Sequence, residues 1–166
     1  MLCSMEHVFH TIPPVWSPES EILILGTMPS PESRRAAFYY AHPQNRFWPV
    51  LARVYGAPPP RTQEEKIALV LSHRLALWDV LKSCDIAGAS DASIQNPVAN
   101  DIAGLIAKTN VSRVLCTGKT AARLYTQLVE PEAGIPCEIL PSPSAANARM
   151  PVGALINAYR AALQKT

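Results

Sequence analysis

The sequence lacks the features that mark membrane, secreted and metal-cluster proteins. Its four cysteines are widely spaced and include no C-x-x-C pair, which argues against zinc and iron–sulfur sites. No apolar run approaches the length of a membrane span. The first residues lack a basic segment followed by an apolar one, so no secretory signal is predicted. We therefore expect a cytoplasmic or nucleoid location, with no membrane partner.

What the chain does contain is enough apolar sequence for a globular core. Of its 166 residues, 48% are hydrophobic and 17% are charged, and this length suits a single domain over 1–166. Residues 1–21 are expected to form an N-terminal arm whose apolar side chains pack on a sheet edge. The formal net charge of +2 neither demands nor excludes nucleic acid, because a small footprint needs only a few phosphate contacts.

Short apolar runs alternate with segments of helical periodicity. Strands are predicted over 22–26, 75–80, 112–117 and 135–140, and helices over 45–54, 63–71, 100–106, 119–128 and from 151 onward. This alternation predicts a three-layer α/β/α sandwich with a mainly parallel four-stranded sheet. Residues 82–97 are polar and rich in turn formers, so we expect a functional loop or lid there.

The densest group of chemically useful side chains follows the first predicted strand. The apolar run ends at Gly26, and Thr27-Met28-Pro29-Ser30 opens a loop. From residue 38 the loop reads Phe-Tyr-Tyr-Ala-His-Pro-Gln-Asn-Arg-Phe-Trp, whereas an ordinary connector is short and polar. A long loop after a buried strand is where an α/β protein usually holds its ligand.

This loop and a second run resemble the two motifs of the uracil-DNA glycosylase superfamily. The second run is Leu-Pro-Ser-Pro-Ser-Ala-Ala-Asn-Ala-Arg over 140–149. The similarity is greatest to the hypoxanthine-DNA (deoxyinosine) glycosylases, which are related to the mismatch-specific enzymes. The resemblance implies a uracil-DNA glycosylase-like fold and an enzyme that flips a deaminated base out of DNA and removes it, without a cofactor or metal. Some branches carry an iron–sulfur cluster, but the cysteine spacing here does not fit one.

Asn45 is the predicted catalytic residue. The resemblance to the hypoxanthine branch implies that activity depends on the asparagine of the His-Pro-Gln-Asn run, and an amide can bind the base or orient water without titrating. The alternative is that Asn45 caps the helix that follows, and the two roles can coexist. Met28 stands where other branches hold the Asp or Asn that handles the attacking water. A thioether is only a weak acceptor, so Met28 argues against a standard uracil-specific enzyme.

Further residues are predicted to contact the base or the DNA. The predicted base-binding set is Gly26, Thr27, Met28, Pro29, Phe38, Tyr40 and His42. The predicted DNA-binding set is Ser30, Arg46, Lys119, Ser142, Ser144, Asn147 and Arg149. Tyr40 is the candidate that stacks on the flipped base, although it could be a half-buried core residue, and His42 could instead fix a turn. Asp79 ends a predicted strand and could face the crevice, but a lone acid there is more often structural.

The resemblance implies a glycosylase, most similar to those that remove hypoxanthine from deoxyinosine. Neither motif contains a lysine that could form a Schiff base, so we expect a monofunctional enzyme that attacks with water. Its partner would be DNA containing a deaminated base, and it would act as a monomer. The alternatives are uracil excision from mismatches or single strands, a non-catalytic DNA- or nucleotide-binding module, and a small-molecule hydrolase. A nucleotide triphosphatase is excluded, because Arg113 stands where the P-loop before Gly118 needs its first glycine.

Overall fold

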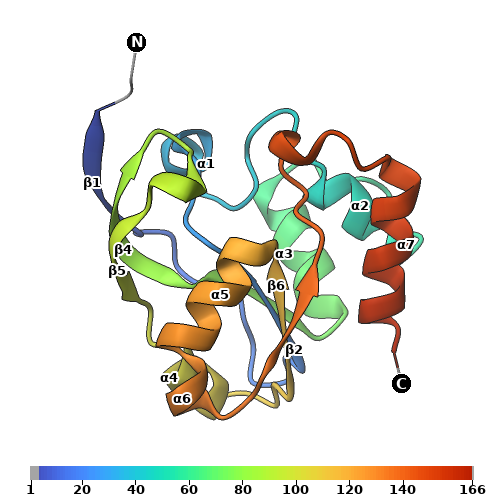
Figure 1. The fold of residues 1–166 in the computed structure, drawn as a ribbon. Coiled ribbons are helices and arrows are strands. Elements are labelled where there is room, and N and C mark those ends of the chain that lie inside the picture. Colours follow the sequence, from blue (N-terminus) through green and yellow to red (C-terminus); the bar gives the residue numbers. More distant parts are fainter. Residues whose placement is uncertain (1–3, 166) are drawn as a thin grey trace.

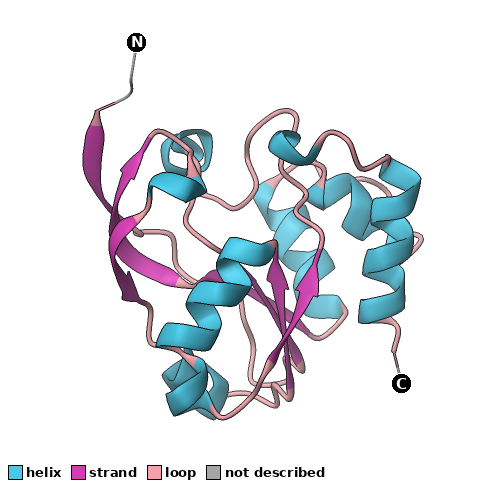
Figure 2. Cartoon of the chain, viewed as in Figure 1, coloured by secondary structure: helices cyan, strands magenta, loops and turns pink. Residues whose placement is uncertain are grey.

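The computed structural model describes residues 4–165, which form a four-stranded and a three-stranded sheet with helices around them (Figures 1 and 2). The main sheet is parallel, in the order β3-β2-β6-β7, and consists of β2 (Ile22–Gly26), β3 (Leu75–Asp79), β6 (Arg113–Thr117) and β7 (Cys137–Leu140). The second sheet is antiparallel, in the order β1-β4-β5, and consists of β1 (Met5–Phe9), β4 (Leu81–Ala87) and β5 (Gln95–Ala99). The predicted parallel four-stranded sheet is confirmed.

Helices cover both faces of the main sheet. The described residues form the helices α1 (Pro31–Ala36), α2 (Phe47–Val54), α3 (Gln63–Ser72), α4 (Ile102–Ala107), α5 (Lys119–Leu128), α6 (Glu130–Ala133) and α7 (Val152–Leu163), with 3-10 turns η1 (Asp91–Ser93) and η2 (Ala145–Asn147). Strand β2 shows why two layers are needed: Ile24 lies in one core, and Leu23 and Leu25 lie in the other. Because successive side chains of a strand point to opposite faces, an uninterrupted apolar run must be buried on both.

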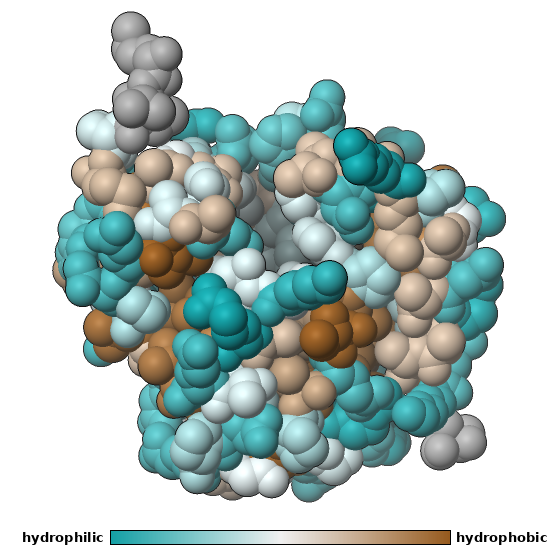
Figure 3. Space-filling view, in the orientation of Figure 1, coloured by the Kyte–Doolittle hydropathy of each residue, from teal (hydrophilic) through white to brown (hydrophobic). Residues whose placement is uncertain are grey.

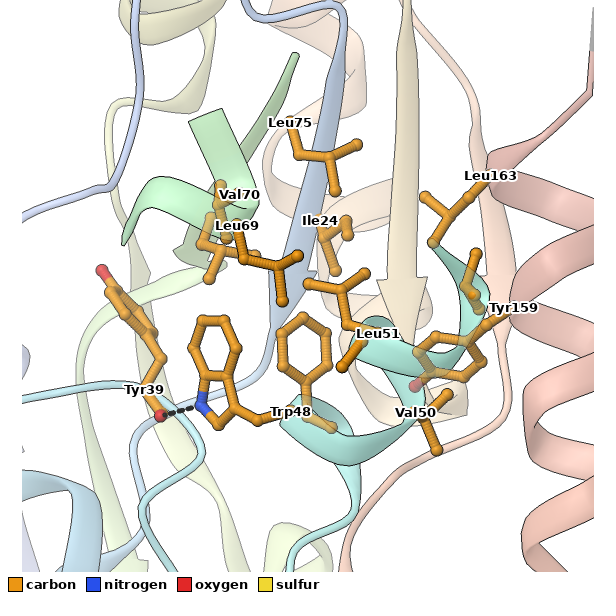
Figure 4. Close-up of a cluster of buried hydrophobic side chains, with 14 of the residues drawn as sticks. Ile24, Tyr39, Trp48, Val50, Leu51, Leu69, Val70, Leu75, Tyr159 and Leu163 are labelled. Atoms are coloured by element: carbon orange, nitrogen blue, oxygen red, sulfur yellow. Dashed lines mark hydrogen bonds between the residues drawn. The ribbon is translucent and has the colours of Figure 1, made fainter. Parts of the chain in front are cut away.

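The core under α2, α3 and α7 is rich in aromatic residues (Figure 4). Phe47 and Tyr159 are fully buried there and meet edge to face, with ring centroids 6.4 Å apart. The indole Nε1 of Trp48 donates to the backbone oxygen of Tyr39 at 3.0 Å, the bond drawn in Figure 4. This core therefore anchors the loop between α1 and α2, which belongs to the first motif.

Residues 82–97 are not the loop or lid expected from their composition. They form β4, η1 and most of β5, and β4 pairs with both β1 and β5. The sheet buries Val8 and Cys84 but leaves many polar side chains in solvent, so its strands look like loop sequence. Residues 5–9 likewise form a paired strand rather than a loose arm. Val15, further along, pairs with Leu77 at the edge of the main sheet.

Both motif loops leave the main sheet at the same end, where its parallel strands terminate. Gly26 and Asp79 are register partners at the ends of β2 and β3, and Thr117 ends the neighbouring strand β6. The second motif follows β7 directly and ends at α7 (Figure 1). Segments about a hundred residues apart therefore meet at the carboxyl ends of the strands, where ligands bind in open parallel sheets.

Candidate active site

A cavity of about 420 Å³ opens at the carboxyl end of the main sheet. Its walls come from the first-motif loop, the ends of β3 and β6, the η1 turn and the second-motif loop, and the surface is hollowed between these segments (Figure 3). The predicted site residues that line it are Gly26, Thr27, Met28, Pro29, Ser30, Tyr40, Asn45, Ser142 and Ser144. This volume is typical of small-molecule sites and suits a nucleobase with part of its sugar.

Gly26 lies beneath the floor of the cavity, and three side-chain oxygens lie close together above it. A Cβ atom added to Gly26 would lie 2.5 Å from Asp79 Oδ1, 3.5 Å from the Tyr40 hydroxyl and 3.6 Å from Thr117 Oγ1. Real Cβ contacts are never that short, so only glycine allows the Asp79 carboxylate to cross the end of β2. The floor is therefore polar and open because residue 26 has no side chain.

Tyr40 forms one wall of the cavity. Its backbone is left-handed, with φ of 53°, and its ring stacks on Phe47 with centroids 4.0 Å apart and planes 19° apart. Because Phe47 covers one face of the ring, a base can stack only on the other. Burial, together with the charge of Asp79, raises the pKa of the Tyr40 hydroxyl well above its ordinary value. Tyr40 therefore stays a neutral phenol that can donate a hydrogen bond at pH 7.

Asn45 fixes the turn before α2 and lines the cavity. Its Oδ1 accepts from the backbone N–H of Phe47 at 2.9 Å, at the start of α2. That bond identifies Oδ1 and leaves Nδ2 as the donor end of the amide. Among residues 4–165, Nδ2 has no hydrogen-bond partner, so this donor is available to a bound molecule. The N-cap of α2 is Arg46, without a side-chain capping bond, so the capping role considered for Asn45 is not confirmed.

Met28 also lines the cavity and packs partly against the core on the α5 side of the sheet. Its thioether can contact a base but cannot hold a water molecule by strong hydrogen bonds. A water molecule bound in this cavity would therefore have to be held by other groups.

Arg46 joins the two motif loops. Its guanidinium donates to the backbone oxygens of Met150 at 2.5 Å and Asn147 at 2.9 Å, and its backbone N–H donates to Pro143 O at 3.0 Å. The Tyr159 hydroxyl fixes the same loop by donating to Pro141 O at 2.8 Å. The predicted DNA contact of Arg46 would thus have to share a guanidinium that already positions the second motif.

Hydrogen bonds within the second-motif loop shape its turns. Ser142 Oγ accepts from Ser144 N at 3.2 Å, and Ser144 Oγ accepts from Ala146 N at 3.2 Å, at the start of η2. The Asn147 amide donates to Ser142 O at 3.0 Å. Both serines face the cavity, whereas Asn147 lines a neighbouring groove of about 600 Å³ together with Lys119. Lys119 and Arg149 are both exposed.

Two predicted base-binding residues lie outside the cavity lining. Phe38 is in the core, only 7% exposed, with its ring stacked on Trp48 at a centroid distance of 6.0 Å. The His42 ring accepts from Gln44 N at 3.0 Å through Nδ1, and His42 O accepts from Asn45 N at 2.9 Å. His42 therefore has the turn-fixing position that was its alternative, and Phe38 supports the loop from beneath.

The cavity includes two acids, Asp79, which the sequence offered as a residue that could face the crevice, and Asp91, which it did not. Asp79 is only 4% exposed, and its Oδ2 lies 2.8 Å from His10 Nε2. Asp91, in η1, lies 3.4 Å from the Thr27 hydroxyl, which donates to it. Desolvation raises the pKa of the Asp91 carboxyl, and the nearby charge of Asp79 adds to this. The position of Asp79 at the end of a predicted strand had indicated that it could face the crevice, but no local pattern indicates Asp91 or His10.

The cavity thus combines an aromatic wall with amide, hydroxyl and carboxylate groups. This combination can hold a flat, polar ring by stacking and by hydrogen bonds along its edge. Within the described residues, no group of three or more His, Cys, Asp or Glu side chains could hold a metal ion.

The chain belongs to the uracil DNA glycosylase superfamily, whose sequence model matches residues 13–164. It is 36% identical over 138 residues to a protein of Methanosarcina acetivorans named hypoxanthine DNA glycosylase, covering 82% of this chain and 87% of the relative. A protein of the same name from Methanosarcina barkeri is 32% identical over 139 residues, with the same coverage. The fold is similar to the solution NMR structure of a Methanosarcina acetivorans protein described as a candidate uracil DNA glycosylase. The TM-score is 0.76 at 30% identity, over 92% of this chain and 96% of the other.

Proposed function

We propose that this chain is a monofunctional DNA glycosylase that hydrolyses the bond between hypoxanthine and deoxyribose in DNA. The observation that carries this proposal is the Asn45 amide, which lines a nucleobase-sized cavity with its Nδ2 donor unengaged. The names of the two relatives agree with this substrate. Because Met28 lacks a strong hydrogen-bonding group, the proposal does not depend on a water site at that position.

The proposed reaction needs a flipped base, a polar contact to the base and a water molecule. The C1′–N bond breaks with its electron pair passing to the base, the water oxygen bonds to C1′, and a water proton neutralises the departing base. Tyr40 offers one ring face for stacking, and Asn45 offers an amide that does not change charge with pH. None of the residues lining the cavity is a lysine, so no Schiff base with the abasic sugar is expected there.

The proposed partner is DNA containing a deaminated base, bound by a monomer in the cytoplasm or nucleoid. Exposed Lys119 and Arg149 near the cavity are proposed to contact phosphates, with Ser30, Ser142, Ser144 and Asn147 as uncharged backbone contacts. No helix in the described part of the chain is long and apolar enough to cross a bilayer.

The test is excision from labelled duplexes that carry one deoxyinosine or one deoxyuridine, followed by alkaline cleavage of abasic sites. We expect hypoxanthine release, without strand cleavage before alkali. Asn45→Ala should slow release by about 100-fold or more, the usual effect of removing one preorganised donor. Loss of the hydrogen bond from Phe47 N should also lower the free energy of unfolding by about 1 kcal/mol.

Asn45→Asp is the matched control for the hydrogen bond to Phe47. It keeps an oxygen for the Phe47 N–H but removes the Nδ2 donor, so it should fold normally and still lose activity. An active Asn45→Asp variant would show that excision does not need the Nδ2 donor.

The second candidate activity is uracil excision, favoured by the similarity to the structure described as a candidate uracil DNA glycosylase. Release of uracil alone would establish it and would contradict the argument from Met28. If hypoxanthine is the main substrate, Met28→Asn should raise uracil excision, because the new amide can hold water. Release of neither base would favour a binding module.

A further inference from the structure

Asp91 lies where the cavity meets the neighbouring groove. Four residues line both spaces: Asp91, Thr117, Ser142 and Ala146. The hydroxyl of Thr117 already donates to the backbone oxygen of Leu25 at 3.3 Å, and that of Ser142 already accepts from Ser144 N at 3.2 Å. Of the four, Asp91 carries the ionisable group. Its carboxylate is therefore the strongest hydrogen-bond acceptor along this shared border.

The second sheet brings Asp91 to this position. Asp91 begins η1, the turn between β4 and β5. The Ser93 hydroxyl donates to Ser90 O at 2.6 Å and accepts from Ala87 N at 2.8 Å. Ile94 N donates to the backbone oxygen of Asp91 at 3.3 Å. These bonds close the turn on both sides of Asp91, so its backbone is held against the cavity.

Thr27 holds the Asp91 side chain from the first-motif loop. Thr27 is only 7% exposed, and its hydroxyl donates to Asp91 Oδ2 at 3.4 Å. Among residues 4–165, Asp91 Oδ1 has no hydrogen-bond partner. Thr27 directly precedes Met28, so the carboxylate reaches the part of the cavity where residue 28 offers only a thioether. One carboxylate oxygen is thus held, and the other is available to a bound molecule.

The position of Asp91 indicates which part of a flipped nucleotide it would face. A flipped base enters its pocket while the sugar stays attached to the strand outside. In the proposed function the base occupies the cavity, and Lys119, which lines the groove, contacts a phosphate. The sugar connects base and phosphate, so it would lie at the border of the two spaces. Asp91 is exposed at this border, whereas Asp79 is only 4% exposed at the end of β3.

Hydrolysis at C1′ benefits from a carboxylate beside the sugar. Positive charge develops on the sugar as the bond to the base breaks, and the attacking water becomes acidic as its oxygen bonds to C1′. A carboxylate can stabilise that charge and accept the proton, whereas an amide such as Asn45 can only orient the water. Partial desolvation, together with the charge of Asp79, raises the pKa of the Asp91 carboxyl. The ionised carboxylate is therefore a better proton acceptor than a fully solvated aspartate.

We propose that Asp91 Oδ1 accepts a hydrogen bond from the attacking water and takes its proton as the water oxygen bonds to C1′. The C1′–N9 bond breaks with its electron pair passing to the base. The base then takes up a proton and Asp91 returns one to solvent, so the reaction consumes one water molecule.

This inference rests on the proposed glycosylase function and adds the group that handles the water. Asp91 is then a catalytic residue, because it touches the reacting water. Thr27 is a positioning residue that acts through Asp91.

The first test separates the chemical step from DNA binding. In single-turnover excision of hypoxanthine, Asp91→Asn should be at least about 100-fold slower than the parent protein, because general-base catalysis contributes about 10²–10⁴-fold. Its affinity for a duplex that carries 2′-fluoro-2′-deoxyinosine, whose glycosidic bond resists cleavage, should remain close to the parent's. Asp85→Asn is the matched control, because Asp85 lies in β4 outside the cavity lining, and it should change neither quantity.

The second test supplies the missing carboxylate from solution. Asp91→Ala should be about as slow as Asp91→Asn, and added formate should speed it, because formate can occupy the place of the side chain and accept the same proton. Sodium chloride at equal ionic strength is the control, since salt by itself weakens DNA binding. Formate should not speed the parent protein or Asn45→Asp, because both keep Asp91.

Thr27→Val tests the positioning role. It removes the hydroxyl that donates to Asp91 and should slow excision by about fivefold, the effect of losing one neutral hydrogen bond. In the Asp91→Ala background the same substitution should have no further effect, because the residue acts only through Asp91. An equal effect in both backgrounds would remove Thr27 from the inference.

The outcomes separate this inference from the proposed function. An Asp91→Asn variant that excises hypoxanthine at the parent's rate, or that is slow only because it binds the uncleavable duplex weakly, would overturn the inference while the glycosylase function stood. A failure of formate to speed Asp91→Ala would also contradict it. If the parent protein releases neither hypoxanthine nor uracil, the proposed function fails and this inference fails with it.

Discussion

Two histidine–aspartate pairs, one beneath the cavity and one on the surface, show how burial changes the meaning of the same contact. His10 and Asp79 are 2.8 Å apart with side chains 1% and 6% exposed, whereas His7 and Asp85 are 2.6 Å apart with side chains 51% and 27% exposed. The two histidines lie three residues apart in the same N-terminal segment. The chain therefore provides its own comparison of a buried and an exposed pair.

The shorter contact belongs to the pair that we expect to matter less. The His7–Asp85 pair is exposed, so water can take the place of either partner in the hydrogen bond. Asn96 also donates to Asp85 at 2.7 Å, so the carboxylate keeps a donor without His7. Beneath the cavity, the loss of one partner leaves a charged or polar group buried without a hydrogen bond. Distance alone is a poor guide to the energetic importance of a pair, and the surroundings decide it.

The largest effect is expected from Gly26→Ala, which should disrupt the buried His10–Asp79 pair. The new Cβ would lie 2.5 Å from Asp79 Oδ1 and must displace the carboxylate from its bond with His10. We expect excision to fall by about 100-fold, the effect of a shift of about 1 Å in a reacting site. The free energy of unfolding should fall by about 1–3 kcal/mol, measured by chemical denaturation.

Gly153→Ala is the matched control for that substitution. Gly153 lies in α7, and a Cβ atom there would meet nothing within 4 Å. Alanine should stabilise the helix by about 0.5–1 kcal/mol and leave excision unchanged. A Gly26→Ala variant that behaved like Gly153→Ala would mean that the floor of the cavity adjusts freely.

The second effect compares the two histidines directly. His10→Ala should lower the free energy of unfolding by about 3 kcal/mol, because Asp79 then keeps its burial but loses its donor. His7→Ala should leave the melting temperature within experimental error. Differential scanning calorimetry of the two variants beside the parent protein measures both. Equal losses would show that exposure does not separate the pairs.

The main sheet was predictable because its strands are buried on both faces. A run such as Leu23-Ile24-Leu25 can be satisfied only in the middle of a layered fold, so composition and length identify it. The polar strands β4 and β5 gave no such signal, since their alternation mixes buried residues such as Cys84 with exposed ones. Local sequence therefore found the sheet that carries the site and missed the sheet that supports it.

The site itself was predictable in part. Asn45 and Tyr40 were expected at the cavity because their loop follows a strand end, and both line it. The aromatic content of that loop could not tell Phe38, which points into the core, from Tyr40. The contact of His10 with Asp79 joins residues 69 positions apart and depends on the β1–β4 pairing, so no local spacing encodes it.

The smallest expected effect is the pH dependence of the stability that the exposed His7–Asp85 pair contributes. Hydrogen bonds from Asn96 and His7 lower the pKa of the Asp85 carboxyl below its ordinary value. A carboxyl whose pKa is lower in the folded state stabilises the fold above its unfolded-state pKa, and this contribution disappears as pH falls through the folded-state pKa.

The difference in unfolding free energy between the parent protein and Asp85→Asn should therefore be small at pH 7 and vanish at strongly acidic pH. Urea denaturation at both pH values measures it, and added salt should shrink the difference at pH 7. A difference that persisted in acid would mean that Asn96 and His7 stabilise Asp85 through its shape rather than its charge. The exposed pair would then resemble the buried pair more closely than its solvent exposure implies.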